Sequence, residues 1–172
     1  QNSGGAVVTN TSADLSGTNA KGNFSIAGGS AANMLLENGG YLTVFDGHQA
    51  SDTMVGSDGK LDVRSGGSVT GTIVNNGGRE NINSGGSATS TTLNSGGIQA
   101  VSSGGNALNA SVNDGGRQYL YAGNATKTTV NNGGRQYVSS GGSATKTTVN
   151  SGGRQHVYKN GNVTETIIMD GG

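Results

Sequence analysis

A nineteen-residue unit repeats along most of the chain. The clearest copy is Arg135–Gly153, which reads RQYVSSGGSATKTTVNSGG and carries one Gly-Gly pair in its interior and a second at its end. The same pattern recurs in Tyr41–Gly59, Lys60–Gly78, Arg79–Gly97, Ile98–Gly116, Arg117–Gly134 and Arg154–Gly172, with a more degenerate copy at Gly22–Gly40. Fixed self-similarity at a period near twenty residues is the signature of a solenoid.

The composition excludes two other kinds of glycine-rich chain. The sequence has 34 Gly among 172 residues and no Pro, which excludes collagen, and the regular spacing of the glycines argues against a disordered linker. Hydrophobic residues make up 30% and aromatic residues 4% of the chain, too little to fill one central core. A solenoid tolerates this composition, because each coil buries only a few inward side chains and stacks on its neighbours.

Aligned copies form columns of apolar residues that predict the interior. The three columns are Val44, Val63, Ile82, Val101, Leu120, Val138 and Val157; Val55, Val74, Leu93, Val112, Val130, Val149 and Ile168; and Ala50, Val69, Ala88, Ala107, Ala125, Ala144 and Val163. Parallel pairing of each coil with the next produces such columns, and recurring glycine disfavours helices. We therefore expect an all-β fold, a right-handed parallel β-helix of about eight 19-residue coils.

Alternation within the strand segments orients the polar residues. If Val149 points inward, Thr147 and Thr145 should also point inward, and Lys146 and Thr148 should face solvent. Ice-binding solenoids present such threonine pairs outward, so this orientation argues against that function.

Two further features concern the corners. Asparagines precede the second Gly-Gly pair of most coils, and we expect them to stack and to satisfy backbone groups of the turn. The coil at Arg117–Gly134 has eighteen residues, and the alignment places its deletion at the corner formed by residues 121–123.

The chain divides into two parts. Residues 1–21 do not fit the repeat, and we expect an N-terminal cap or irregular first coil there, followed by the β-helix over residues 22–172. The sequence stops at Gly172, on a repeat boundary, which suggests a fragment of a longer array.

The residues needed for catalysis are scattered. His48 and His156 lie about six coils apart, and Asp46, Asp62 and Glu80 fall in three different columns, whereas an active site needs convergent titratable groups. The chain has no Cys, and we expect no metal site and no cofactor. We therefore expect no enzymatic activity. An enzyme that acts on polysaccharides is the alternative, since such enzymes also use β-helices.

Two sets of surface residues are candidate sites. The first is a contact strip that combines basic and aromatic columns: Arg117, Tyr119, Arg135, Tyr137, Arg154 and His156. The second is the serines that precede glycine at the corners: Ser65, Ser84, Ser95, Ser103, Ser140 and Ser151. Serine also favours turns for conformational reasons alone, and ladders of charged residues are often only solvated.

Charge is distributed unevenly although the formal net charge is zero, so bulk attraction to nucleic acid is not expected. Acidic residues dominate positions 1–58 and basic residues dominate positions 117–172. Two rods laid antiparallel would place acidic coils beside basic ones, which predicts one possible mode of self-association.

The repeats SSGGSATKTTVNSGG, NSGGSATSTTLNSGG and RSGGSVTGTIVNNGG resemble those of the AIDA-type self-associating autotransporter adhesins. The resemblance extends from Leu15 to Gly172. It implies a β-helical passenger domain exported through the outer membrane of a Gram-negative bacterium to the cell surface. It also implies autoaggregation, biofilm formation, adhesion to a host-cell receptor or glycan, and O-heptosylation of the corner serines by a dedicated heptosyltransferase. Asp46, Ala122 and Lys159 replace the corner serine in three coils, so these corners are not expected to be modified.

Overall fold

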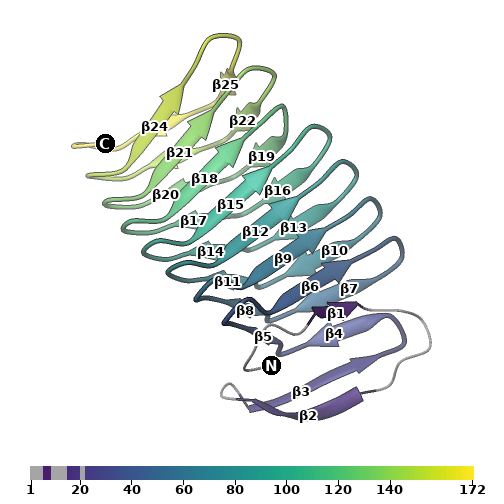
Figure 1. The fold of residues 1–172 in the computed structure, drawn as a ribbon. Coiled ribbons are helices and arrows are strands. Elements are labelled where there is room, and N and C mark those ends of the chain that lie inside the picture. Colours follow the sequence, from purple (N-terminus) through teal and green to yellow (C-terminus); the bar gives the residue numbers. More distant parts are fainter. Residues whose placement is uncertain (1–5, 9–14, 20–21) are drawn as a thin grey trace.

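Three β-sheets run along the long axis of the molecule, because each regular coil contributes one short strand to each sheet (Figure 1). A computed structural model describes residues 6–8, 15–19 and 22–172 of the chain. The expected cap over residues 1–21 therefore lies partly outside the described residues. No helix in the described ranges is long and apolar enough to cross a membrane.

Sheet A begins each regular coil. Its strands are β1 (Ala6–Val8), β6 (Tyr41–Val44), β9 (Lys60–Val63), β12 (Arg79–Ile82), β15 (Ile98–Val101), β18 (Arg117–Leu120), β21 (Arg135–Val138) and β24 (Arg154–Val157).

Sheet B follows after the first Gly-Gly corner. Its strands are β2 (Leu15–Asn19), β3 (Gly22–Ala27), β4 (Ser30–Ala32), β7 (Gln49–Ser51), β10 (Ser68–Thr70), β13 (Ser87–Thr89), β16 (Asn106–Leu108), β19 (Asn124–Thr126), β22 (Ser143–Thr145) and β25 (Asn162–Thr164).

Sheet C closes each coil with two-residue strands. They are β5 (Leu35–Leu36), β8 (Met54–Val55), β11 (Ile73–Val74), β14 (Thr92–Leu93), β17 (Ser111–Val112), β20 (Thr129–Val130), β23 (Thr148–Val149) and β26 (Ile167–Ile168).

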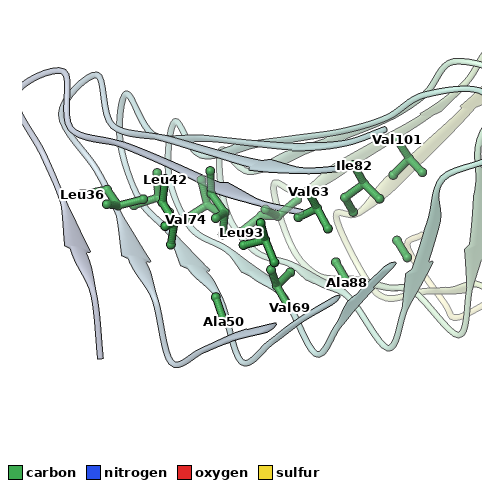
Figure 2. Packing of buried hydrophobic residues seen from close by; sticks show 14 of the residues in the cluster. Leu36, Leu42, Ala50, Val63, Val69, Val74, Ile82, Ala88, Leu93 and Val101 are labelled. Carbon is green, nitrogen blue, oxygen red and sulfur yellow. The ribbon is translucent and has the colours of Figure 1, made fainter. Parts of the chain in front are cut away.

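The parallel β-helix prediction is confirmed by the pairing of neighbouring coils. Equivalent residues pair in register, for example Val63 with Ile82 and Ile82 with Val101 in sheet A. The predicted apolar columns point into the space between the sheets and are buried over most of their length (Figure 2). Their members in the last coil described, Val157 and Ile168, are 46% and 66% exposed.

Seven coils, from residue 41 to residue 172, carry a strand in all three sheets, and the copy at residues 22–40 differs from them. Its first strand, β3, pairs antiparallel with both β2 and β4, so only β4 and β5 join the parallel stack. Gly28 and Gly29 connect β3 to β4 with positive φ angles of 54° and 77°. Two such residues form the tight turn that favours a β-hairpin, which explains why this Gly-Gly pair reverses the chain instead of starting a corner.

The inward orientation is correct for Thr147 and wrong for Thr145. Thr147 is fully buried, whereas Thr145 is half-buried and lies on the opposite face of β22 from the buried Ala144. Lys146 between the two threonines has a left-handed backbone with φ 57°. This single-residue corner resets the alternation, so two residues separated by it need not share a face.

The asparagine column forms a ladder of side-chain amides. Each Nδ2 donates to the Oδ1 of the preceding coil, from Asn94 to Asn75 at 2.9 Å and onward to Asn150, which donates to Asn131 at 2.7 Å. The asparagines therefore mainly satisfy one another, and not the turn backbone as expected. The deletion in the coil at 117–134 lies in the corner as predicted, since β18 and β19 keep the register of their neighbours.

A ladder of polar side chains runs from coil to coil through the interior. The apolar columns alone did not predict it. Glu80, Gln99, Gln118 and Gln136 are fully buried at the second position of sheet A. Gln99 donates to Glu80 at 2.7 Å, Gln118 to Gln99 at 2.6 Å, Gln136 to Gln118 at 2.7 Å, and Gln155 to Gln136 at 2.7 Å. Alternation from the inward Ile82 and Val138 would have identified this column. Burial raises the pKa of Glu80, opposed by the hydrogen bond from Gln99.

Candidate functional site

The six predicted serines occupy equivalent places in tight turns. Ser65, Ser84, Ser103 and Ser140 lie at the corner between sheets A and B, and Ser95 and Ser151 lie at the corner between sheets C and A. All six are exposed, and each precedes a glycine whose φ lies between 72° and 75°. A backbone hydrogen bond closes each turn, as in Gly67 N to Arg64 O at 2.9 Å. A left-handed residue at the third turn position is the geometry for which glycine is favoured.

The glycine of the next coil leaves space beside four of these hydroxyls. A Cβ added to Gly85 would lie 2.6 Å from Ser65 Oγ, and one added to Gly104 would lie 2.8 Å from Ser84 Oγ. The same distance of 2.8 Å relates Gly115 to Ser95 Oγ and Gly171 to Ser151 Oγ. A larger residue at the position of this glycine would crowd the serine hydroxyl. Glycine therefore leaves the hydroxyl accessible on the side that faces the next coil.

Ser103 and Ser140 have different neighbours in the next coil. The corner above Ser103 is the shortened one at residues 121–123, and the corner above Ser140 carries Asn160 in the left-handed position, with φ 62°. Ser57, which does not precede a glycine in the sequence, is also exposed at a corner, but its own φ is 40° and Asp58 follows it.

The contact strip lies on the outer face of β18, β21 and β24. The rings of Tyr119 and Tyr137 stack with centroids 4.7 Å apart and planes 9° apart, and Tyr137 stacks on His156 at 5.0 Å and 11°. Arg117, Arg135 and Arg154 pair in register beside them and form the second column. The strip therefore brings together all six residues that the sequence indicated.

Two tyrosines outside the predicted strip extend this aromatic group. Tyr121 stacks against Tyr119 at 5.8 Å with planes 2° apart, and Tyr158 lies against Tyr137 at 6.5 Å and 18°. Both follow sheet A strands at the corner. They lie two residues after the column of Tyr119, Tyr137 and His156. This spacing in the sequence could have identified them as members of the aromatic group. Burial is the main cause that raises the pKa of the Tyr119 hydroxyl, and the neighbouring Tyr137 raises this pKa further.

The carboxylates and histidines considered above for catalysis occupy different places in the described part of the chain. Asp46 lies at an exposed corner, Asp62 on the outer face of sheet A, and Glu80 in the interior. His48 Nδ1 lies 2.8 Å from the Asp46 backbone carbonyl oxygen, far along the rod from His156. No group of three or more His, Cys, Asp or Glu that could hold a metal exists in the described ranges. Asp58 and Asp62 line one surface hollow, where Asp62 accepts hydrogen bonds from Tyr41 and Asn81, while Asp46 and Glu80 lie elsewhere.

Near the N-terminal end of sheet A, polar side chains on its outer face bind one another. Asp62 accepts hydrogen bonds from the Tyr41 hydroxyl, from Asn81 Nδ2 at 2.7 Å and from Arg64 at 3.3 Å. Arg79 Nε donates to Asn81 Oδ1 at 2.6 Å. The side chains of Tyr41, Asp62, Arg64, Arg79 and Asn81 therefore bind one another.

Comparisons with known proteins all find bacterial autotransporter proteins. Residues 16–78 and 119–172 match the family described as an adhesin of the bacterial autotransporter system, probable stalk. The chain is 85% identical over 46 residues to the autotransporter adhesin/invasin TibA of Escherichia coli O78:H11, which is 27% of this chain and 5% of TibA. It is 75% identical over 44 residues to the autotransporter CRAC of Citrobacter rodentium, which is 26% of this chain and 3% of CRAC. The chain thus spans only a small part of these relatives.

A solved structure extends the similarity to the fold. The crystal structure of a TibA fragment, hyper-glycosylated by TibC catalysis, superposes with a TM-score of 0.71 at 53% identity. The alignment covers 84% of this chain and 60% of that fragment.

Proposed function

The chain belongs to the adhesins of bacterial autotransporter systems, and we propose that it is a section of a passenger domain that carries O-linked heptose on its corner serines and mediates adhesion. Members of this group are exported across the outer membrane to the cell surface, where an extended rod can reach other cells. The single observation that carries the proposal is the row of exposed turn serines on a fold shared with a glycosylated adhesin fragment.

The corner geometry supports modification of the folded chain. Each serine lies in an exposed turn, so an enzyme can approach its hydroxyl without opening a strand. The TibA fragment was glycosylated by TibC, and a heptosyltransferase of this kind is the partner we expect here. We expect Ser65, Ser84, Ser95 and Ser151, whose neighbour in the next coil is glycine, to be modified more completely than Ser103 and Ser140.

Co-expression with a TibC-type heptosyltransferase tests this proposal. Intact mass gives the number of attached heptoses, and peptide mapping gives their positions. A matched variant with all six serines changed to alanine should lose most of the added mass. Modification concentrated on the buried Thr128 or Thr147 would contradict the corner geometry.

Homotypic association is the second part of the proposed function, and it includes autoaggregation and biofilm formation. The charge asymmetry supports it less simply than the sequence suggested, since Asp46, Asp52 and Asp58 lie on three different corners of the rod. Cells that display the chain should settle faster than cells without it. Sedimentation of the purified chain over a salt series measures how much of this association is electrostatic.

The enzymatic alternative has a direct test. Incubation of the chain with a panel of polysaccharides should release no reducing ends, because Asp62, which lines a surface hollow together with Asp58, is already held by hydrogen bonds from Tyr41, Asn81 and Arg64. Release of reducing ends would favour the enzyme over the adhesin.

A further inference from the structure

The polar contacts on the outer face of sheet A differ between the two ends of the rod. In the strands β6, β9 and β12, Asp62 and Asn81 bind the neighbouring Tyr41, Arg64 and Arg79. In β18, β21 and β24 the same two columns hold the contact strip of Arg117, Tyr119, Arg135, Tyr137, Arg154 and His156. No carboxylate reaches the strip: within the described residues the ion pairs are Arg64–Asp62 and Lys146–Glu165.

The three arginines of the strip form a row of like charges. They pair directly across neighbouring parallel strands, which are about 4.8 Å apart. Like charges placed directly opposite one another on a sheet are destabilising. An anion that spans several coils would offset this repulsion, and guanidinium groups bind carboxylates, sulfates and phosphates with paired hydrogen bonds.

The aromatic column beside the arginines presents ring edges. Because Tyr119, Tyr137 and His156 stack nearly parallel at 4.7 and 5.0 Å, their faces cover one another. The hydroxyls of Tyr119 and Tyr137 form no hydrogen bond with any described residue. The column therefore offers hydroxyl groups at one-coil intervals, and inside the stack it offers no free ring face on which a nucleic-acid base would lie.

We propose that the contact strip binds a linear anionic glycan that lies along the rod axis. Carboxylate or sulfate groups of the glycan contact the arginines, and its sugar hydroxyls exchange hydrogen bonds with the tyrosines. One sugar unit of an extended glycan is about as long as the spacing between coils, so successive sugars meet successive coils. This inference rests on the proposed adhesive function and names the chemical class of its partner.

A second copy of the chain fits the strip less well. The acidic residues of the N-terminal corners, which would have to face the arginines, are divided among three corners: Asp46 between sheets A and B, Asp52 between B and C, and Glu37 and Asp58 between C and A. A rod docked side by side presents at most two of these corners to a neighbour, whereas a flexible polyanion can follow one column.

Binding of the purified chain to immobilised heparin, hyaluronan, neutral dextran and single-stranded DNA tests the proposal. The variant Arg117→Gln/Arg135→Gln/Arg154→Gln should bind heparin and hyaluronan at least tenfold more weakly. The control Lys127→Gln/Lys146→Gln/Lys159→Gln removes the same charge from the same coils but from other edges, and should change the affinity less than twofold. Tyr119→Phe/Tyr137→Phe keeps the stack, removes only the hydroxyls and should weaken binding about threefold.

Several outcomes would overturn the proposal. They are no binding of either anionic glycan at low salt, equal losses in the arginine and lysine variants, DNA binding as tight as heparin binding, or a strip that serves only self-association in sedimentation. Adhesion of chain-coated beads to cultured cells is measured in parallel. Adhesion that persists unchanged in the arginine variant would reject the strip and leave the adhesive function standing, whereas beads that never adhere would reject the adhesive function itself.

Discussion

The coils at residues 41–78 and those at residues 79–172 have the same backbone arrangement but different buried side chains. We call them the leucine coils and the amide coils, after the second position of sheet A. This position holds Leu42 and Leu61 in the first group, and Glu80, Gln99, Gln118, Gln136 and Gln155 in the second. Both kinds of residue lie in register and are buried, except Gln155 in the last coil, which is half-buried, so the column accepts either chemistry.

The threonine column shows the cost of a mismatch. In the amide coils Thr128 donates to Gln118 at 3.2 Å and Thr147 donates to Gln136 at 3.3 Å. In the leucine coils the hydroxyl of Thr53 is buried without a partner among the described residues, whereas the hydroxyl of Thr72 lies beside the Glu80 carboxyl group. A buried polar group in this fold is therefore stable when the column opposite supplies its partner, and it is a defect when that column is apolar.

Glu80 lies at the junction of the two groups. Its Oε2 accepts from Gln99 and from Thr91 at 3.0 Å, whereas the neighbouring coil on the other side has Leu61 at the same position and places the Thr72 hydroxyl beside the carboxyl group. The junction thus combines a buried carboxyl group with the end of an amide ladder.

The largest loss of stability is expected at a column that is apolar in both groups of coils. Val138 belongs to an apolar column that runs through both, so Val138→Asp would bury an unpaired carboxylate and should lower the free energy of unfolding by more than about 4 kcal/mol. Lys146→Ser, at an exposed corner where another coil carries Ser90, should change it by less than about 0.5 kcal/mol. Equal shifts in chemical denaturation would contradict the assignment of inside and outside.

Breaking the amide ladder should cost less but still be large. Gln118→Leu removes the partner of Gln99 Oε1, Gln136 Nε2 and the Thr128 hydroxyl, and should destabilise the chain by about 3 kcal/mol. Changing all five members of the column to leucine extends the leucine coils, and we expect this variant to be more stable than the single one. If the fivefold variant is the less stable of the two, the column does not behave as a unit.

The junction should respond to pH. Because burial raises the pKa of Glu80 above its unfolded value, the stability this group contributes is complete below the unfolded pKa and is lost as the pH rises through the folded pKa. Glu80→Gln removes the charge and offers a donor toward Thr72. Its melting temperature should exceed that of the wild type at pH 7, and the difference should shrink toward pH 4. A constant difference across this range would show that ionisation of Glu80 is not the cause.

The smallest effects separate the two threonine environments. Thr53→Val removes an unpaired hydroxyl and should stabilise the chain by about 0.5–1 kcal/mol. Thr128→Val and Thr147→Val remove hydrogen bonds to the amide ladder and should each destabilise it by about 1 kcal/mol. Thermal melting of the three variants under one condition is sufficient, and a shift of the same sign in Thr53→Val as in the other two would remove the distinction between the two groups of coils.

Much of the fold and part of the candidate site were predictable because the repeat is translational. Parallel pairing brings equivalent residues together, so the stacked Tyr119, Tyr137 and His156 and the row of arginines follow from alignment alone. Thr145 was misplaced because alternation holds only within a strand, and a left-handed residue such as Lys146 interrupts it. The antiparallel pairing of β3 was missed because a Gly-Gly pair permits both a corner and a hairpin, and only the partner strands select between them.

The sequence by itself determined the coil length, the inward apolar columns, the corner serines and the family, since each depends on residue type at a fixed spacing. Only the tertiary structure decided which buried hydroxyls and amides find partners, that the carboxyl group of Glu80 ends a ladder, and that the strip arginines have no carboxylate beside them among the described residues. The physical reason is that hydrogen bonds and ion pairs between coils depend on distances of a few tenths of an ångström and on side-chain direction, whereas repeat spacing specifies only which residues are neighbours.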